Sequence, residues 1–161
     1  MSCIPCTEES STIPIEDIDR WTDSLRQVLE NKNGRKYFKE FLISREFEES
    51  EATLEFWERS EDLLKSDTHA PHKPSSHHKH ASIEKLRFLK SAKDLVAFAE
   101  DRVDFDLAQL RLLYEAVDSG KEDKIKAVFN QAMQSAAENL EQHYELFRKD
   151  LLKRKGLVPR K

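Results

Sequence analysis

Apolar residues recur every three or four positions along most of the chain, and no stretch of any length alternates apolar and polar residues. The first half predicts three helices. The first begins near Pro14 and is expected to end at Gly34, which would supply a left-handed C-cap. The second follows Gly34, and the third begins after residue 52. The inner positions of these helices are Trp21, Leu25, Val28 and Leu29, then Tyr37, Phe38, Phe41 and Leu42, then Leu54, Phe56, Trp57, Leu63 and Leu64.

The second half shows the same period in three further segments, at residues 83–101, 103–120 and 123–155. Asp104 or Asp106 is expected to cap the middle helix, and Gly120 is expected to end it. The inner positions of the first segment are Leu86, Leu89, Ala92, Leu95, Val96 and Ala99, and those of the last are Phe129, Met133, Ala136, Leu140, Tyr144 and Phe147. The chain is therefore expected to be an all-α bundle of roughly six or seven helices.

Three polar segments delimit the predicted bundle. Residues 1–14 are rich in Ser and Thr and are expected to be a disordered N-terminal tail. Residues 66–82 hold five histidines and two prolines but no apolar residue larger than alanine, so they are expected to be a disordered loop. Residues 156–161 are expected to be a basic C-terminal tail. We therefore expect a single helical domain over residues 15–155, interrupted by the His-rich loop.

Composition narrows the classes of function. The chain has 161 residues, of which 36% are charged, and its net charge is −4. A net charge of this sign and size does not indicate nucleic-acid binding, which calls for an excess of basic residues. No run of about 18 apolar residues exists to span a membrane. We expect a cytoplasmic protein, with weak peripheral contact at the inner face of the plasma membrane as an alternative for the basic tail. Two acidic runs, EFEESEATLE and AEDRVDFD, are expected to be solvated faces or a partner-binding surface.

Candidate chemistry is sparse. Cys3 and Cys6 supply only two ligands where a structural zinc site needs four, so they are interpreted as free thiols, with reversible acylation as the alternative. The His-rich loop lacks groups that would fix a metal ligand, and a solvated loop is the simpler interpretation. His143 has no partnering nucleophile or paired carboxylate in a motif. We expect no catalytic residue, no resident metal and no cofactor.

The apolar pattern resembles that of the regulator of G-protein signalling (RGS) family. Trp21, Ser24 and Leu25 match its W-x-x-S-L pattern, and a glycine and F-x-x-F-L follow at the family's spacing. The family's E-F pair is matched by Glu46 and Phe47, and its F-W-x-x-x-E pattern by Phe56, Trp57 and Glu61. Weaker matches in the second half are Ala92, Lys93, Phe98, Val103, Tyr144 and Phe147. The resemblance covers about 135 residues and implies an RGS-like helical bundle.

The resemblance implies a function without catalytic groups of its own. Members of the family bind the GTP-bound α subunit of a heterotrimeric G protein and accelerate GTP hydrolysis by holding its switch loops. The α subunit already carries the required arginine and glutamine. The activity implied here is at most that of a GTPase activator, and the positions expected to contact the α subunit are Glu46, Phe47, Glu49, Thr53, Asp104 and Gln142.

Several of these positions depart from the family's pattern. Thr53 and Asp104 stand where the family has asparagines, Gln142 stands at the place of an aspartate, and Leu146 at that of an arginine. An amide donates a hydrogen bond, whereas a carboxylate only accepts one. The alternative is therefore a catalytically silent RGS-like scaffold that binds another signalling protein or a peptide.

Overall fold

The computed structural model describes residues 13–65 and 78–157. Within these residues the chain forms seven helices, α2 to α8, and no strand, which confirms the all-α prediction. The chain divides into two compact units. Unit 1 comprises the residues up to Glu46 and those from Glu141 onward, and unit 2 comprises Phe47–Leu140. Helix α8, Glu122–Leu157, supplies residues to both.

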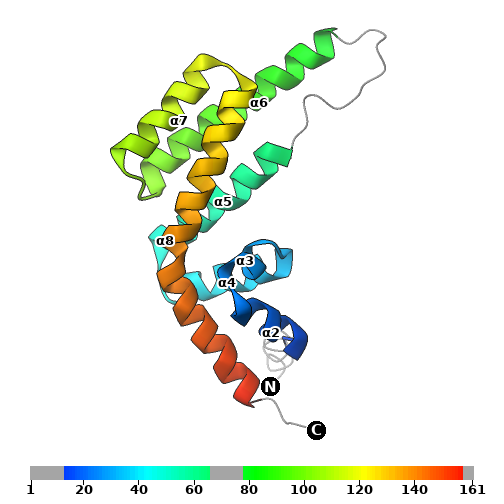
Figure 1. The fold of residues 1–161 in the computed structure, drawn as a ribbon, viewed down its shortest axis with the longest axis vertical. Helices are drawn as coiled ribbons and strands as arrows, with labels where there is room; N and C mark the ends of the chain where they lie inside the picture. The colour runs from blue at the N-terminus through cyan, green and yellow to red at the C-terminus, as the bar shows by residue number, and fades with distance from the viewer. Residues whose placement is uncertain (1–12, 66–77, 158–161) are drawn as a thin grey trace, which may run out of the picture. The chain divides into compact units, whose positions relative to one another are not determined.

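Unit 1 begins with three helices, α2 (Ile15–Asp23), α3 (Leu25–Leu29) and α4 (Lys32–Ser44) (Figure 1). The prediction of one continuous helix before Gly34 was wrong, because Ser24 takes an extended conformation with φ −163° and ψ 157° between α2 and α3. The Ser24 hydroxyl accepts a hydrogen bond from the Gln27 N–H at 3.3 Å and so caps α3. A serine followed by a helical stripe thus marks a new helix start.

Gly34 has a different role from the predicted C-cap. It lies in the first turn of α4, where the Asn31 side chain caps the helix by accepting from the Gly34 N–H at 2.9 Å. A Cβ atom on Gly34 would lie 2.8 Å from the Val28 carbonyl oxygen and 3.0 Å from Trp21 Nε1. Glycine is therefore required because α4 approaches the preceding backbone closely, and not because the chain turns left-handed there.

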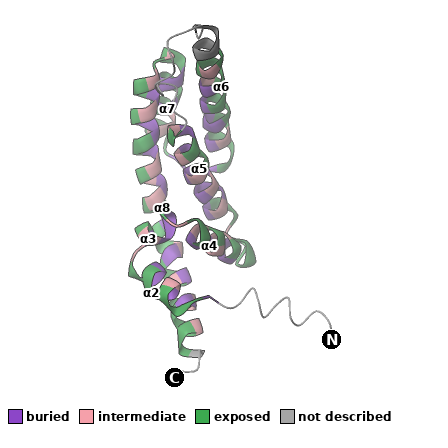
Figure 2. Cartoon of the chain, turned by 90° about the vertical axis from the view of Figure 1, so that its right-hand side faces the viewer, coloured by how far each residue is buried: buried purple, intermediate pink, exposed green. Residues whose placement is uncertain are grey.

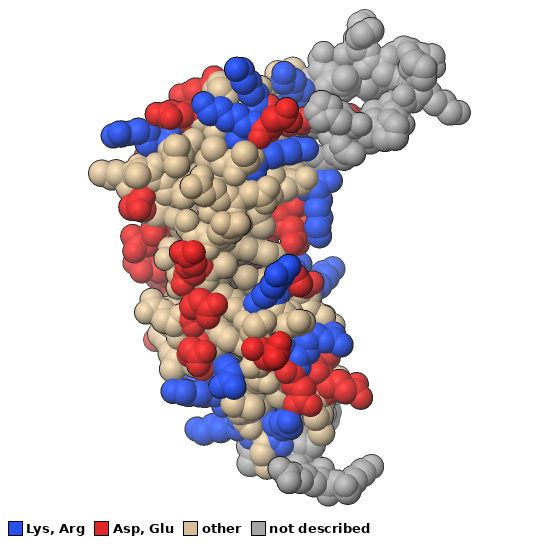
Figure 3. Space-filling model, viewed as in Figure 1, with Lys and Arg blue, Asp and Glu red and all other residues tan. Residues whose placement is uncertain are grey.

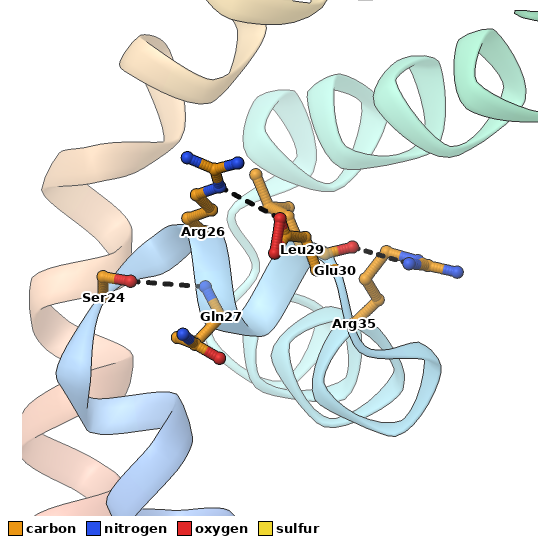
Figure 4. A network of polar contacts seen from close by, with 6 residues as sticks. All are labelled: Ser24, Arg26, Gln27, Leu29, Glu30 and Arg35. Atoms are coloured by element: carbon orange, nitrogen blue, oxygen red, sulfur yellow. Dashed lines mark hydrogen bonds and ion pairs between the residues drawn. The ribbon is translucent and has the colours of Figure 1, made fainter.

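Polar contacts hold the short helix α3 in place (Figure 4). The Arg35 guanidinium, from α4, donates to the Leu29 carbonyl at 2.6 Å and satisfies an acceptor at the end of α3. Arg26 and Glu30 form an exposed ion pair at 3.0 Å. Such a pair adds little stability by itself, whereas the Arg35 contact joins α3 to α4.

The C-terminal part of α8 completes unit 1. Its Tyr144 hydroxyl donates to the Trp21 carbonyl and its Arg148 Nε donates to the Thr22 carbonyl, each at 2.8 Å. Both carbonyls belong to the last turn of α2, where no intrahelical donor is available. On the same side of α8, the Phe147 ring lies 5.0 Å from that of Phe38. The C-terminal residues of α8 therefore cap α2 and close the apolar core of this unit.

Replacing Tyr144 by phenylalanine tests this cap. We expect Tyr144→Phe to lower the free energy of unfolding by about 1–2 kcal/mol, because the buried Trp21 carbonyl loses its donor. Burial raises the pKa of the Tyr144 phenol to about 12. The folded state therefore favours the neutral phenol. The stability that Tyr144 contributes is complete below about pH 10 and is lost as the pH rises towards 12. The free energy of unfolding in urea, measured across this pH range, should fall in the wild type and fall less in Tyr144→Phe. Equal dependence of the two proteins on pH would contradict the proposed cap.

Unit 2 is an antiparallel four-helix bundle. It contains α5 (Glu48–Lys65), α6 (His78–Arg102), α7 (Leu107–Ser119) and the part of α8 before Glu141. Successive helices run in alternating directions, with α5 packed on α6 and α6 on α7 (Figure 1). Helix α5 begins earlier than predicted. Helix α6 begins at His78, so the expected loop boundary at residue 82 was wrong, and the rest of that loop lies outside the described residues.

Aromatic rings fill the centre of unit 2. The Phe56 ring, which is fully buried, meets the Phe105 ring edge-on at 5.0 Å and stacks on Phe129 at 6.1 Å. On α6 the predicted inner residue Leu86 is 65% exposed, while Phe88 is buried in its place. The core stripe of α6 therefore starts later than the sequence indicates. Figure 2 shows the resulting arrangement, in which each helix carries buried residues on one side and exposed residues on the other.

Two predicted helix boundaries in unit 2 are confirmed. The Asp106 carboxylate accepts from the Gln109 N–H at 2.7 Å and caps α7. Gly120 ends α7 with φ 68° in the left-handed region. At the other limits of the predicted domain, Ile13 is buried although it falls in the expected tail, and α8 extends to Leu157.

Candidate partner-binding surface

The turn between α4 and α5 presents the first two predicted contact residues. Glu46 is exposed and its backbone has φ 60°, the one positive φ at a non-glycine residue in the described part of the chain. This conformation costs of order 1 kcal/mol for a residue with a Cβ. The turn is held by the Glu46 N–H, which donates to the Ile43 carbonyl at 3.0 Å. The half-buried Phe47 follows, and its carbonyl accepts from Glu51 at the start of α5.

The first turns of α5 carry the next two predicted residues, in different settings. Glu49 is exposed, and the acidic first turn of α5 is favoured by the partial positive charge at a helix N-terminus. Thr53 is only 4% exposed, and its hydroxyl donates to the Glu49 carbonyl at 2.7 Å. The Thr53 hydroxyl is thus already used within the helix.

The turn between α6 and α7 carries Asp104. Its carboxylate is exposed, while its neighbours Val103 and Phe105 are buried and anchor the turn. The Asn139 side-chain amide of α8 donates to the Asp104 carbonyl at 3.5 Å. The turn is therefore held by its two buried neighbours and by α8, while Asp104 itself is exposed.

Two neighbouring segments of unit 2 carry exposed acidic side chains. The contact between the Phe56 and Phe105 rings places the first half of α5 beside the turn between α6 and α7. The exposed or half-exposed carboxylates of these two segments are together called the acidic face. They are Glu48, Glu49, Glu51, Glu55, Asp101, Asp104 and Asp106. Acidic side chains gather along the left-hand edge of the view in Figure 3. A partner for this face would need cations or hydrogen-bond donors.

Few cations offset this negative charge. Arg59 pairs with Glu55 at 3.5 Å, and its guanidinium stacks 4.9 Å above the Phe98 ring. Arg102 also lies over Phe98, at 5.9 Å. The sequence marks both acidic runs, but it does not show that they lie together. Asp101 and Asp106 were consequently not among the predicted contact residues.

The six predicted contact residues are divided between the two units. Phe47, Glu49, Thr53 and Asp104 belong to unit 2, whereas Glu46 and Gln142 belong to unit 1. Gln142 is exposed on α8. Within unit 2, Glu49 and Asp104 are the two predicted residues whose side chains are exposed, and both are carboxylates.

Two other kinds of feature, a metal site and a membrane-spanning helix, are absent from the described residues. No group of three His, Cys, Asp or Glu residues among them is placed to hold a metal ion. Cys3, Cys6 and the predicted loop residues 66–77 lie outside the described part of the chain. None of the described helices combines the length and the apolar character needed to cross a bilayer.

Comparison with known proteins gives a partial match. Over 71 residues the chain is 32% identical to Regulator of G-protein signaling 1 of Rattus norvegicus. The match covers 44% of this chain and 32% of the relative, so the chain spans about a third of that protein's length. No protein-family model matches the chain, and no solved structure matches it. The similarity points to the same family as the apolar pattern, over part of the chain.

Proposed function

We propose that this chain regulates heterotrimeric G-protein signalling by binding the activated α subunit through Phe47 and the acidic face of unit 2. The observation that carries this proposal is the 71-residue similarity to a regulator of G-protein signalling. The burial of the family-like residues supports it, because Trp21, Phe38, Leu42 and Phe56 are all fully buried. The resemblance therefore concerns residues that determine the fold, and not only surface composition.

The proposed mechanism is preorganisation. The α subunit supplies the arginine and glutamine that act in GTP hydrolysis. The part of this chain is to hold mobile loops of its partner in one arrangement, which lowers the entropic cost of reaching the transition state. Carboxylates such as Glu49 and Asp104 would accept hydrogen bonds from those loops, and Phe47 would contribute an apolar contact.

A second function, a silent scaffold for another protein, is favoured by the setting of Thr53. Its hydroxyl is buried and bonded to the Glu49 carbonyl, so it cannot replace the amide that the family places there. Asp104 offers only acceptors at the second amide position. We therefore propose that binding to the α subunit is accompanied by weak acceleration of GTP hydrolysis, or by none.

Single-turnover hydrolysis measures how much acceleration accompanies binding. GTP-loaded α subunits of several classes would be mixed with saturating amounts of this chain, and phosphate release would be followed. We expect an increase in rate of less than about tenfold, equivalent to about 1.4 kcal/mol of transition-state stabilisation. A larger increase would show that Thr53 and Asp104 serve in place of the two amides, and would exclude the scaffold.

A further inference from the structure

A cavity lies within unit 1. Its volume is about 270 Å³, and it is lined by α4, α8 and the residue that precedes Pro14. Buried apolar side chains, Ile13, Phe41 and Phe147, contribute to the lining. The volume is slightly below the range of about 300–1,000 Å³ for sites of drug-sized ligands. It suits one large apolar side chain together with its main-chain groups.

The cavity also has a cation without a carboxylate partner. The guanidinium of Arg45, at the end of α4, lies 4.9 Å above the ring of Phe41 and lines the cavity. Among the described residues, no acidic side chain pairs with it. A guanidinium held over an aromatic ring keeps its N–H edge available for a carboxylate.

The remaining charges of the lining define what else a ligand must carry. Arg154 Nε and Asp150 are paired at 3.2 Å and largely neutralise each other. Glu40 also lines the cavity and has no ion-pair partner among the described residues. Its carboxylate would accept from an N–H group. One acceptor, one guanidinium and the three apolar side chains in the lining match the three groups at the end of a polypeptide.

We propose that this cavity binds the C-terminal residue of a polypeptide partner with an apolar last side chain. The terminal carboxylate would pair with Arg45, the main-chain N–H would donate to Glu40, and the side chain would fill the space beside Phe41 and Phe147. Capture of a chain terminus by charge and shape is an established mode of peptide recognition. This inference is independent of the proposed binding to an α subunit.

Three small probes separate the parts of this inference. The ¹⁵N-labelled full chain would be titrated with N-acetyl-phenylalanine, N-acetyl-phenylalaninamide and N-acetyl-glycine, and amide chemical shifts would be followed. We expect saturable shifts at residues 37–45 and 147–154 with N-acetyl-phenylalanine at millimolar concentration. The neutral amide should bind about three- to fivefold more weakly, because it lacks the ion pair. N-acetyl-glycine, without the apolar side chain, should give no saturable shift.

Variants identify the responsible cation. Arg45→Gln should remove the preference for the acid over the amide, and it should leave the fold intact because Arg45 is exposed. Arg59→Gln is the matched control, since Arg59 stacks on Phe98 at the same 4.9 Å but does not line the cavity. The proposal is overturned if N-acetyl-phenylalanine gives no saturable shift at these residues, if acid and amide bind the wild type equally, or if Arg45→Gln retains the preference.

Discussion

Replacing Gly34 by alanine is expected to lower the free energy of unfolding by about 2 kcal/mol, although alanine is the better helix former. The added Cβ would lie 2.8 Å from the Val28 carbonyl oxygen and 3.0 Å from Trp21 Nε1. The first of these atoms is backbone, so α4 must move away from α3 to relieve the overlap. Trp21 and Val28 are fully buried, and that movement would loosen the core of unit 1. Urea unfolding followed by circular dichroism and tryptophan fluorescence measures the effect.

Gly156 provides the matched control for this substitution. It also lies in a helix, but a Cβ there meets nothing within 4 Å. Gly156→Ala should therefore leave stability unchanged or raise it by up to about 1 kcal/mol. If Gly34→Ala were as stable as Gly156→Ala, the close approach of α4 to the Val28 backbone would not be a feature of the folded protein.

Reversing two charges of the acidic face, with Glu49→Lys and Asp104→Lys together, is expected to weaken binding of an activated α subunit about 30-fold or more, equivalent to about 2 kcal/mol. Both carboxylates are exposed, so the cost should fall on binding rather than on folding. Each lysine would meet the donors or cations that the carboxylates were proposed to attract. Titration calorimetry or surface plasmon resonance at two salt concentrations measures the change.

A double variant around the opposite end of α7, with Asp118→Lys in the last turn of α7 and Asp123→Lys in the first turn of α8, changes the net charge by the same amount. These residues are also exposed, and the 13 residues of α7 span about 20 Å between the two ends. This control should bind within about threefold of the wild type, since long-range effects are screened by salt. If both double variants lost the same amount of affinity, the effect would come from net charge and not from the acidic face.

The apolar period predicted the all-α class and much of the core correctly. Trp21, Phe38, Leu42 and Phe129 are all fully buried, as their spacing indicated. Periodicity does not distinguish a continuous helix from two helices that share one apolar side, so the break at Ser24 was missed. It also does not show how closely two backbones approach. For that reason Gly34 was predicted to have the conformational role that Gly120 has in the structure.

The candidate surface was less accessible to sequence reasoning. The acidic residues of α5 and of the turn after α6 are far apart in the chain, and the Phe56–Phe105 contact that brings them together is a tertiary contact. The position of Thr53 could be matched to a motif, but its burial and its hydrogen bond to the Glu49 carbonyl depend on how α5 packs. The left-handed backbone of Glu46 likewise has no signal in the sequence, because glutamate rarely adopts it.

Binding that depends on the nucleotide state of an α subunit is the most direct test of the central claim. The affinity of the full chain would be measured for α subunits loaded with GDP alone and with GDP and aluminium fluoride, which mimics the transition state. We predict at least about tenfold tighter binding to the aluminium fluoride form, because a partner of the activated α subunit must bind the activated arrangement of its loops better than the GDP-bound one. Equal affinity for the two forms, or no binding to either, would contradict the proposed function.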